Sequence, residues 1–289
     1  QVKESLYNLI KRQIIKMALR KSDKLRESIL TLPPISKTYY FLAWLISDAY
    51  ILSYPRSGRT WLKVMLNKML SLKYNLKKDN IYLYRKTLFS KAPNIVSEHP
   101  FEPDYPTIYP YPKMKVGKKF KKKKIILLFR DPRDLVVSNY HEYTKRKKIW
   151  QGELSQFIKE PYTLPRIIKF MNLWHEETKK RKDILILKYE RTKEDPFGEL
   201  KKVSEFLGIN ASDEILKEAV EYGSIENMRK LEVKDHFKHD KLRPANLDDI
   251  NSYKVRKAKA GSYKEELNEE DIAYMNQQIS ERLVKEIGY

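Results

Sequence analysis

The chain has 289 residues, with 59 Lys and Arg against 38 Asp and Glu, and a formal net charge of +21. A charge of this size favours anionic partners such as nucleotides, phosphates, acidic glycans, nucleic acid or anionic lipid. The absence of cysteine excludes a disulfide framework and thiolate chemistry, and five histidines without cysteine argue against a structural zinc site. With 41% hydrophobic residues, the chain is long enough for one large α/β domain or two small ones.

The N-terminal residues 3–30 have the pattern of a basic amphipathic helix, in which apolar side chains recur at helical spacing among Lys and Arg. The apolar positions are Leu6, Ile10, Ile14 and Met17. Such a helix packs on the domain or contacts a membrane surface, and the first is favoured. The longest apolar run, residues 39–46, is far shorter than the ~20 residues of a membrane span. We therefore divide the chain into an N-terminal helical segment, residues 1–38, and a main domain, residues 39–289.

Beyond this segment, strand and helix patterns alternate along the chain. Short apolar runs predict strands at 49–54, 94–97, 124–129 and 184–188. Helices are predicted at 59–73, 131–147, 195–207, 212–221, 224–234 and 269–287. Asp131-Pro132 and Asp195-Pro196 each supply an N-cap and a first-turn proline, and Gly208 ends the third helix. Strands that alternate with helices predict an α/β fold with a parallel sheet covered on both faces.

Three groups of polar residues follow three of the predicted strands, at the point where each strand ends. Residues 54–61 follow the first strand, Glu98-His99 follows the second, and Arg130-Asp131 follows the third. In open parallel sheets, ligands bind beyond the carboxyl ends of the strands. The sequence therefore predicts one site that gathers all three groups at one edge of the sheet.

The first group, YPRSGRTW at residues 54–61, has the physical form of a phosphate cradle. Gly58 permits close backbone approach, and the start of a helix supplies free N–H groups. Further side-chain donors are Arg56, Ser57, Arg59 and Thr60. The common P-loop motif is not met, because its first Gly is absent and Arg59 stands where that motif has Lys. On spacing alone, phosphate binding and a plain strand–turn–helix corner are equally supported.

The complete strings resemble those of the cytosolic-type sulfotransferases, which use 3′-phosphoadenosine 5′-phosphosulfate (PAPS). Residues 54–61 resemble the family's 5′-phosphosulfate loop, YPKSGTTW, and residues 130–141 (RDPRDLVVSNYH) resemble its 3′-phosphate segment. Residues 188–209 resemble its YED…FLG segment, and residues 256–264 resemble its RKG…GDWK signature. The resemblance implies a P-loop-like three-layer α/β fold, sulfotransferase activity, PAPS as cosubstrate with PAP as product, and no metal.

The resemblance also assigns roles to individual residues. Arg56 takes the place of the family lysine that contacts the oxygen bridging phosphate and sulfur, so its charge would stabilise the transition state. The 5′-phosphate would be held by Ser57, Gly58, Arg59 and Thr60. The 3′-phosphate would be held by Arg130, Ser138, Arg256, Lys257 and the N–H of Ala258. The adenine would contact Trp61, Tyr189 and Ser224, although Trp61 is also compatible with a core position on a helix.

His99 is the candidate general base. The family often carries KxHxP here, and residues 97–100 of this chain are SEHP. An imidazole with an unperturbed pKa of about 6.5 suits deprotonation of a hydroxyl near neutral pH. Without the other motifs, a solvent-exposed loop histidine would be the simpler interpretation. Glu98 is the alternative base, because some related sulfotransferases use a glutamate.

The sequence departs from the family pattern at several positions. Ser97 replaces the family lysine, Arg59 replaces a threonine, and residues 223–225 (GSI) stand where many relatives have TSF. The family's short dimer motif would start at Lys264, but residues 268–273 do not match it. That mode of dimerisation is therefore not expected.

The acceptor is not identified by any motif. We expect in-line transfer of the sulfuryl group to a hydroxyl or amine. The basic, tyrosine-rich loops at 74–92, 100–123 and 232–254 favour an anionic or glycan acceptor, a glycolipid included. The six lysines within 118–124 either steer an anion or form a solvated loop. A cytoplasmic location is expected, because PAPS is made in the cytosol and cysteine is absent.

A nucleotide kinase and a polyanion-binding protein are the two alternative interpretations of the sequence. A nucleotide kinase would need a full P-loop motif and an acidic site for magnesium, and neither is evident. A protein that binds RNA or another polyanion would explain the charge of +21. It would not explain four motifs in family order, so no specific nucleic-acid partner is expected.

Overall fold

The computed structural model describes residues 47–77, 80–87, 90–100, 116, 120, 122–237, 242–249, 252–255 and 259–289. The helix predicted at 3–30 and the 3′-phosphate residues 256–258 lie outside these described residues, as does most of the loop at 100–123. Within the described ranges, no helix is both long and apolar enough to cross a membrane.

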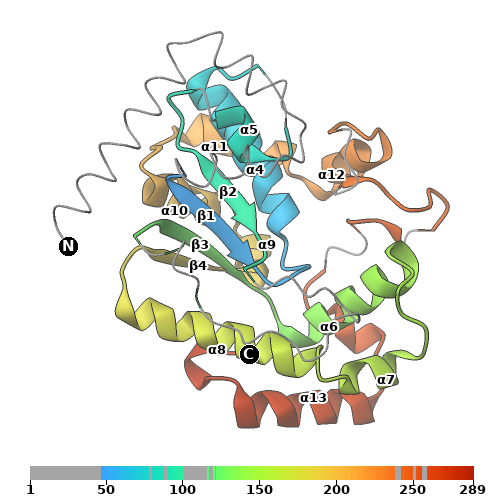
Figure 1. Ribbon diagram of the computed structural model, residues 1–289. Helices are drawn as coiled ribbons and strands as arrows, with labels where there is room; N and C mark the ends of the chain where they lie inside the picture. The colour runs from blue at the N-terminus through green and yellow to red at the C-terminus, as the bar shows by residue number, and fades with distance from the viewer. Residues whose placement is uncertain are drawn as a thin grey trace.

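Four parallel strands form the centre of the molecule (Figure 1). They are β1 (Ala49–Ser53), β2 (Ile95–Glu98), β3 (Lys124–Phe129) and β4 (Ile184–Lys188). Their order in the sheet is β2-β1-β3-β4, and Ala49 pairs with both Ile95 and Lys124. The predicted parallel sheet is confirmed, and each strand begins and ends within one residue of its predicted limits.

Helices cover both faces of this sheet (Figure 1). One layer contains α6 (Pro132–His141), α8 (Leu164–Lys180) and α13 (Glu269–Arg282). The other contains α4 (Arg59–Tyr74), α10 (Pro196–Leu207) and α11 (Asp213–Tyr222). Successive strand residues point to opposite faces, so Tyr50 joins the core of the first layer and Ile51 joins that of the second. The predicted three-layer α/β fold is confirmed.

The predicted Asp-Pro helix starts are present in the structure. The Asp131 carboxylate accepts a hydrogen bond from the N–H of Arg133 at 2.9 Å, and Asp195 accepts one from Gly198 at 2.8 Å. Each carboxylate satisfies an amide that has no partner within its helix. The Asp131 cap fixes where the chain turns away from β3, and hence where the residues that follow β3 lie.

The remaining helical elements are short. They are α5 (Leu83–Thr87), α7 (Leu154–Lys159), α9 (Tyr189–Glu194), α12 (Ile225–Val233), the π-helical turn η2 (Glu142–Arg146) and the 3₁₀ turns η5 (Ser262–Glu265) and η6 (Lys285–Ile287). The single α-helix predicted at 131–147 is therefore wrong in its last turns, which form η2. The helix predicted at 269–287 likewise ends at Arg282 and is followed by η6.

Candidate active site

A cavity of about 700 Å³ lies at the carboxyl-terminal edge of the sheet. Its lining includes Arg56 after β1, His99 after β2, Arg130 after β3 and Tyr189 after β4. The sequence-based prediction that the parallel sheet gathers these groups at one edge is confirmed.

The lining of the cavity is strongly cationic. Its described residues include ten Lys and Arg side chains and one carboxylate, that of Glu142. The cations are Arg56, Arg59, Lys63, Arg130, Arg146, Lys147, Lys193, Arg243, Lys254 and Lys259. A cleft lined by charge of one sign concentrates ligands of the opposite sign. The lining therefore suits a polyanion such as a nucleotide with more than one phosphate.

The loop between β1 and α4 forms the floor of this cavity. Gly58 has a φ of 87°, in the left-handed region, and a Cβ there would lie 2.7 Å from Cδ2 of Tyr189. Only glycine meets both constraints without strain. The loop thus brings the first amides of α4 next to Tyr189, where they can bind an anion.

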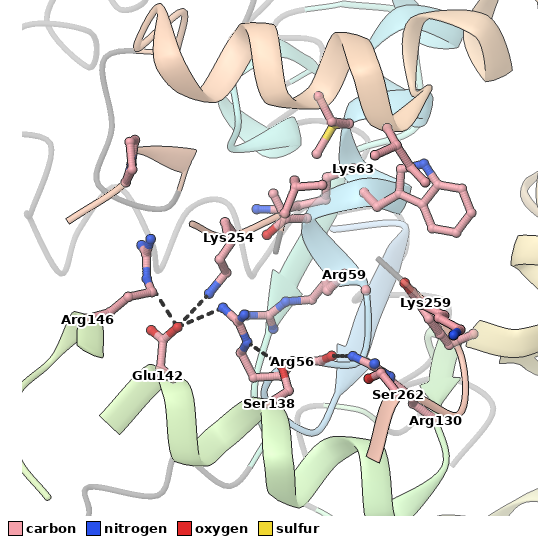
Figure 2. Close-up of a pocket in the computed structure, with 18 of the residues that line it drawn as sticks. Arg56, Arg59, Lys63, Arg130, Ser138, Glu142, Arg146, Lys254, Lys259 and Ser262 are labelled. Carbon is pink, nitrogen blue, oxygen red and sulfur yellow. Dashed lines mark hydrogen bonds and ion pairs between the residues drawn. The ribbon is translucent and has the colours of Figure 1, made fainter. Parts of the chain in front are cut away.

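Arg56 connects this loop to the helix after β3. Its Nε donates to Oγ of Ser138 at 2.9 Å, and its Nη1 donates to Oε2 of Glu142 at 2.7 Å (Figure 2). The Arg56 side chain is only 7% exposed. Its φ of 72° is uncommon for a residue with a side chain and aims it into the cavity wall. The candidate catalytic cation is therefore held in one place by two separate partners.

Glu142 is the centre of a cluster of three cations (Figure 2). Besides Arg56, its Oε2 lies 3.2 Å from Nε of Arg146 and 3.4 Å from Nζ of Lys254. Burial opposes ionisation of Glu142, but attraction to Lys254, Arg56 and Arg146 outweighs burial and lowers its pKa to about 2. Burial, together with repulsion from Arg56, lowers the pKa of Lys254 to about 7. The cluster thus has one firmly ionised carboxylate and an excess of positive charge.

Arg130 is fixed on the opposite side of Arg56. Its Nη1 donates to the carbonyl of Arg56 at 3.1 Å, its Nη2 lies 3.6 Å from Asp134, and its guanidinium lies 4.4 Å from the centre of the Tyr189 ring. Its buried Nε–H has no hydrogen-bond acceptor among the residues that the structure describes. A buried donor of this kind is costly unless it is paired, so this N–H fits a phosphate oxygen.

Aromatic side chains close the end of the cavity at which Arg130 contacts Tyr189. Nε1 of Trp61 donates to the carbonyl of Gly223 at 2.7 Å, and the Trp61 ring meets Tyr189 edge to face at 6.0 Å. A Cβ at Gly223 would lie 2.4 Å from Cγ of Met65, so the chain can approach α4 this closely only at a glycine. Burial raises the pKa of Tyr189. Trp61 packs partly against the core and also lines the cavity.

His99 projects into the cavity just beyond β2. Its Nδ1 lies 2.9 Å from the carbonyl oxygen of Ser53. Because a carbonyl oxygen can only accept, Nδ1 carries the hydrogen in this contact, and in the neutral ring Nε2 then carries the lone pair. Glu98 lies within β2 and is not among the described residues that line the cavity. The local geometry therefore favours His99 over Glu98 as a base.

The cavity gathers most of the residues that the sequence analysis singled out. Those that line it are Arg56, Gly58, Arg59, Thr60, Trp61, His99, Arg130, Ser138 and Tyr189. Ser57 does not, because its hydroxyl donates to the carbonyl of Tyr54 at 2.9 Å. Ser224 caps α12 by accepting from the N–H of Asn227 at 3.2 Å, although both of its neighbours line the cavity. The roles assigned to Arg256, Lys257 and Ala258 concern residues outside the described ranges.

Several charged residues of the lining were not predicted from the sequence. They are Lys63, Glu142, Arg146, Lys147, Lys193, Arg243, Lys254 and Lys259. Glu142 follows the motif at 130–141 directly, and Lys254 lies two residues before the motif at 256–264. Adjacency to a motif was therefore the signal that could have found these two.

Two further expectations concern residues away from the cavity. In the lysine run, Lys123 donates to the carbonyl of Ser47 and Lys124 to that of Phe206, each at 2.7 Å. These two lysines fasten the start of β3 and do not line the cavity. In the part of the chain that the structure describes, no group of three or more Asp, Glu, His or Cys side chains could hold a metal ion.

The fold and the cavity define an α/β protein that binds an anionic ligand beside the loop between its first strand and the following helix. A family model described as the sulfotransferase domain matches residues 47–287. The chain belongs to the sulfotransferase family, and the family resemblance noted in the sequence is confirmed.

Relatives with similar sequences come from plants and mammals. Cytosolic sulfotransferase 3 of Arabidopsis thaliana is 26% identical over 206 residues, which cover 65% of this chain and 63% of that protein, less than two thirds of its length. Flavonol 3-sulfotransferase of Flaveria bidentis is 25% identical over 260 residues, which cover 82% of each chain.

Solved structures show the same fold. A mouse sulfotransferase complexed with PAP superposes with a TM-score of 0.59 at 22% identity, covering 82% of this chain and 83% of that one. Retinol dehydratase in a complex with retinol and PAP gives a TM-score of 0.55 at 20% identity, covering 81% and 80%.

Proposed function

We propose that this chain transfers a sulfuryl group from PAPS to a hydroxyl or amine of an acceptor. The observation that carries the proposal is the meeting of four groups in one cationic cavity: the loop at 56–60, Arg130 with Ser138, the Trp61–Tyr189 pair and His99. They come from the ends of different strands and correspond to the donor-binding and catalytic parts of the family. Two of the solved structures with this fold are complexes with PAP, which supports PAPS as the donor.

The donor-binding part of the proposal assigns each phosphate to one group of residues. The amides at 57–60, with the side chains of Arg59 and Thr60, hold the 5′-phosphosulfate at the start of α4. Arg130, with its Nε–H available, and Ser138 hold the 3′-phosphate. The family motif adds residues 256–258 to this second group. Arg suits the role because its planar fork pairs with two phosphate oxygens.

The proposed chemistry is an in-line displacement. When bound, PAPS supplies the sulfuryl group: the acceptor oxygen bonds to sulfur as the bond from sulfur to the 5′-phosphate oxygen breaks. Nε2 of His99 takes the acceptor proton, and the hydrogen bond from Nδ1 to Ser53 keeps the ring in the tautomer that can do so. Arg56 provides the positive charge that stabilises the phosphate oxygen as it becomes an anion.

The nature of the acceptor and the location of the protein complete the proposal. A glycan or glycolipid suits the cationic lining better than an apolar phenol does. A cytoplasmic location is supported by relatives named as cytosolic sulfotransferases. Residues 1–38 are proposed to form a basic helical segment outside the family domain, which either packs on it or contacts a membrane surface.

The melting temperature of the protein with different ligands tests the proposed function. PAP and PAPS should raise it, whereas ATP with magnesium and RNA should not, because a ligand that binds the folded chain stabilises it by an amount that increases with its affinity. Stabilisation by ATP with magnesium and not by PAP would support a nucleotide kinase instead. Stabilisation by RNA alone would support a polyanion-binding protein. A screen of acceptors with radiolabelled PAPS then establishes the transfer itself.

A further inference from the structure

The two ends of the cavity differ in chemical character. One end carries the Trp61 and Tyr189 rings together with Ile225 and Met228, which suit a nucleobase. The other end is formed by charged residues, which we call the acceptor wall: Glu142, Arg146, Lys147, Arg243 and Lys254. Figure 2 shows Glu142, Arg146 and Lys254 on one side of Arg56, with Arg130 and Ser262 on the other. The acceptor wall therefore lies on the side of the catalytic cation away from Arg130.

The acceptor wall is held together by hydrogen bonds between side chains and backbone groups of different segments. Nη1 of Arg146 donates to the carbonyls of Arg243 at 2.9 Å and Ser252 at 2.7 Å, which ties η2 to two later segments of the chain. The fully buried carboxylate of Glu232 accepts the backbone N–H groups of Lys254 and Val255. Since these contacts fix the backbone on both sides of Lys254, the acceptor wall is formed before any ligand arrives.

Two cations of the acceptor wall are incompletely satisfied by the protein. An ammonium group has three N–H donors. The contact of Lys254 Nζ with Glu142, at 3.4 Å, is the only one its ammonium makes within the described residues. Nζ of Lys147 lies 5.5 Å from the centre of the Tyr143 ring, and no carboxylate among the described residues lies at ion-pair distance from it. Arg243, in contrast, is paired with Asp235.

The balance of charges around Glu142 indicates which charge the ligand of the acceptor wall should carry. The Glu142 carboxylate is shared by Arg56, Arg146 and Lys254, and Arg146 also lies 3.8 Å from the buried carboxylate of Glu232. An apolar acceptor would remove water from these cations without replacing its hydrogen bonds, which is costly. A cationic acceptor would meet net repulsion, because Arg56 and the four cations of the acceptor wall outnumber the three carboxylates paired with them, those of Glu142, Glu232 and Asp235. An added anion would meet neither cost.

We infer that the acceptor carries an oxyanion group (a carboxylate, sulfate or phosphate) near its reacting hydroxyl, and that Lys147 and Lys254 bind this group. The inference rests on the proposed sulfuryl transfer and assigns the chemical class of the acceptor. The lowered pKa of Lys254 agrees with it, because a bound anion would favour the charged ammonium. Both lysines are specificity-determining residues and take no part in proton transfer.

A matched pair of probes tests this inference on the complex of the full chain with PAP. The probes are 4-hydroxyphenylacetate and its neutral amide, 4-hydroxyphenylacetamide, with calorimetry at low salt as the measurement. The carboxylate should bind at least about tenfold more tightly, since charge-assisted hydrogen bonds are stronger than neutral ones. In the Lys147→Met, Lys254→Met double variant, the two affinities should become about equal. Lys145→Met is the control, because Lys145 is an exposed lysine on the same turn, as Lys147 is, but lies outside the cavity lining.

The outcomes separate this inference from the proposed function. Equal binding of the two probes by the unmodified chain, absence of binding by both, or an unchanged preference in the double variant would overturn the inference. The inference would also be overturned if the affinity of the double variant for PAP fell as much as its affinity for the carboxylate, because the two lysines would then bind the nucleotide. Failure of the unmodified chain to bind PAP would instead count against the proposed function.

Discussion

Arg56 and Glu142, 86 positions apart in the sequence, form an ion pair with an Nη1–Oε2 distance of 2.7 Å inside the cavity. Both side chains are largely buried, at 7% and 13% exposure. The pair joins the loop after β1 to η2, while Nε of Arg56 still reaches Ser138. The residue proposed to stabilise the leaving group is thus also a structural link between two segments of the site.

Two substitutions of Arg56 should separate the effect of its positive charge on turnover from the effect of its two hydrogen bonds on stability. Arg56→Met should lower turnover by about 10²–10³, because it removes a charge that acts in the transition state. Arg56→Lys should keep most of the turnover but destabilise the fold by on the order of 1–2 kcal/mol, because an ammonium cannot reproduce the two-sided contact with Ser138 and Glu142. Steady-state kinetics and urea unfolding measure the two effects. Normal turnover in Arg56→Met would contradict the assigned role.

Substitution of His99 should affect catalysis and not donor binding. His99→Ala should lower turnover by about 10²–10⁴, the usual range for loss of a general base, and should remove the acidic limb of the pH–rate profile. The affinity for PAP should stay close to that of the unmodified chain. Glu98→Gln is the control and should retain turnover, because Glu98 does not line the cavity. If Glu98→Gln loses turnover and His99→Ala retains it, the base is Glu98.

The pKa of Glu142 leads to a prediction about acid stability. Its value of about 2 in the folded chain lies below the ordinary 4.5 of a glutamate. A carboxyl with a lowered folded pKa stabilises the fold above the unfolded pKa and loses this contribution as the pH falls towards the folded value. Glu142→Gln should therefore destabilise the chain at pH 6 by on the order of 3 kcal/mol. The difference between the two chains in free energy of unfolding should shrink between pH 4.5 and 2, whereas a constant difference would show that the charge of Glu142 is not responsible.

Gly58 and Gly208 provide a matched pair for the phosphate loop. Both have positive φ, 87° and 71°, but only at Gly58 would a Cβ meet another residue, Tyr189, at 2.7 Å. Gly208→Ala should cost about 1 kcal/mol from backbone strain and leave PAP binding unchanged. Gly58→Ala should cost more, on the order of 2–3 kcal/mol, and should weaken PAP by displacing Tyr189. Calorimetry and thermal unfolding of both variants measure this difference. Equal PAP affinities would show that the close approach to Tyr189 is not needed for binding.

The sheet and the donor-binding part of the cavity could be predicted because their signals are local. The apolar runs of β3 and β4 and the Asp-Pro caps at Asp131 and Asp195 each depend on a few neighbouring residues. The helix α8 was not predicted from the sequence, although Ile167, Ile168 and Met171 recur at helical spacing. Its core-facing pattern was present in the sequence.

The loop at 232–254, which supplies Arg243 and Lys254, was predicted to serve the acceptor. The contribution of Glu142 and Arg146 to the acceptor wall could not be predicted, because their burial depends on pairing between distant segments. Glu142 resembles an exposed helix residue by sequence, and it is buried only because Arg56 lies 86 positions before it and Lys254 lies 112 positions after it. The π-helical turn η2 could not be predicted either, because the sequence at 142–146 is equally compatible with continuation of an ordinary α-helix. Such charge pairs become visible only once the sheet has brought the segments together.

The affinities of PAP and 5′-AMP, measured by calorimetry on the same sample, test the central claim most directly. The two ligands differ only in the 3′-phosphate, for which Arg130 and Ser138 form the proposed pocket. PAP should bind at least about tenfold more tightly, because each charge-assisted hydrogen bond contributes about 1.5–3 kcal/mol. Arg130→Met should reduce this difference in affinity between PAP and 5′-AMP. Equal affinities in the unmodified chain would contradict the assignment of this cavity to PAPS.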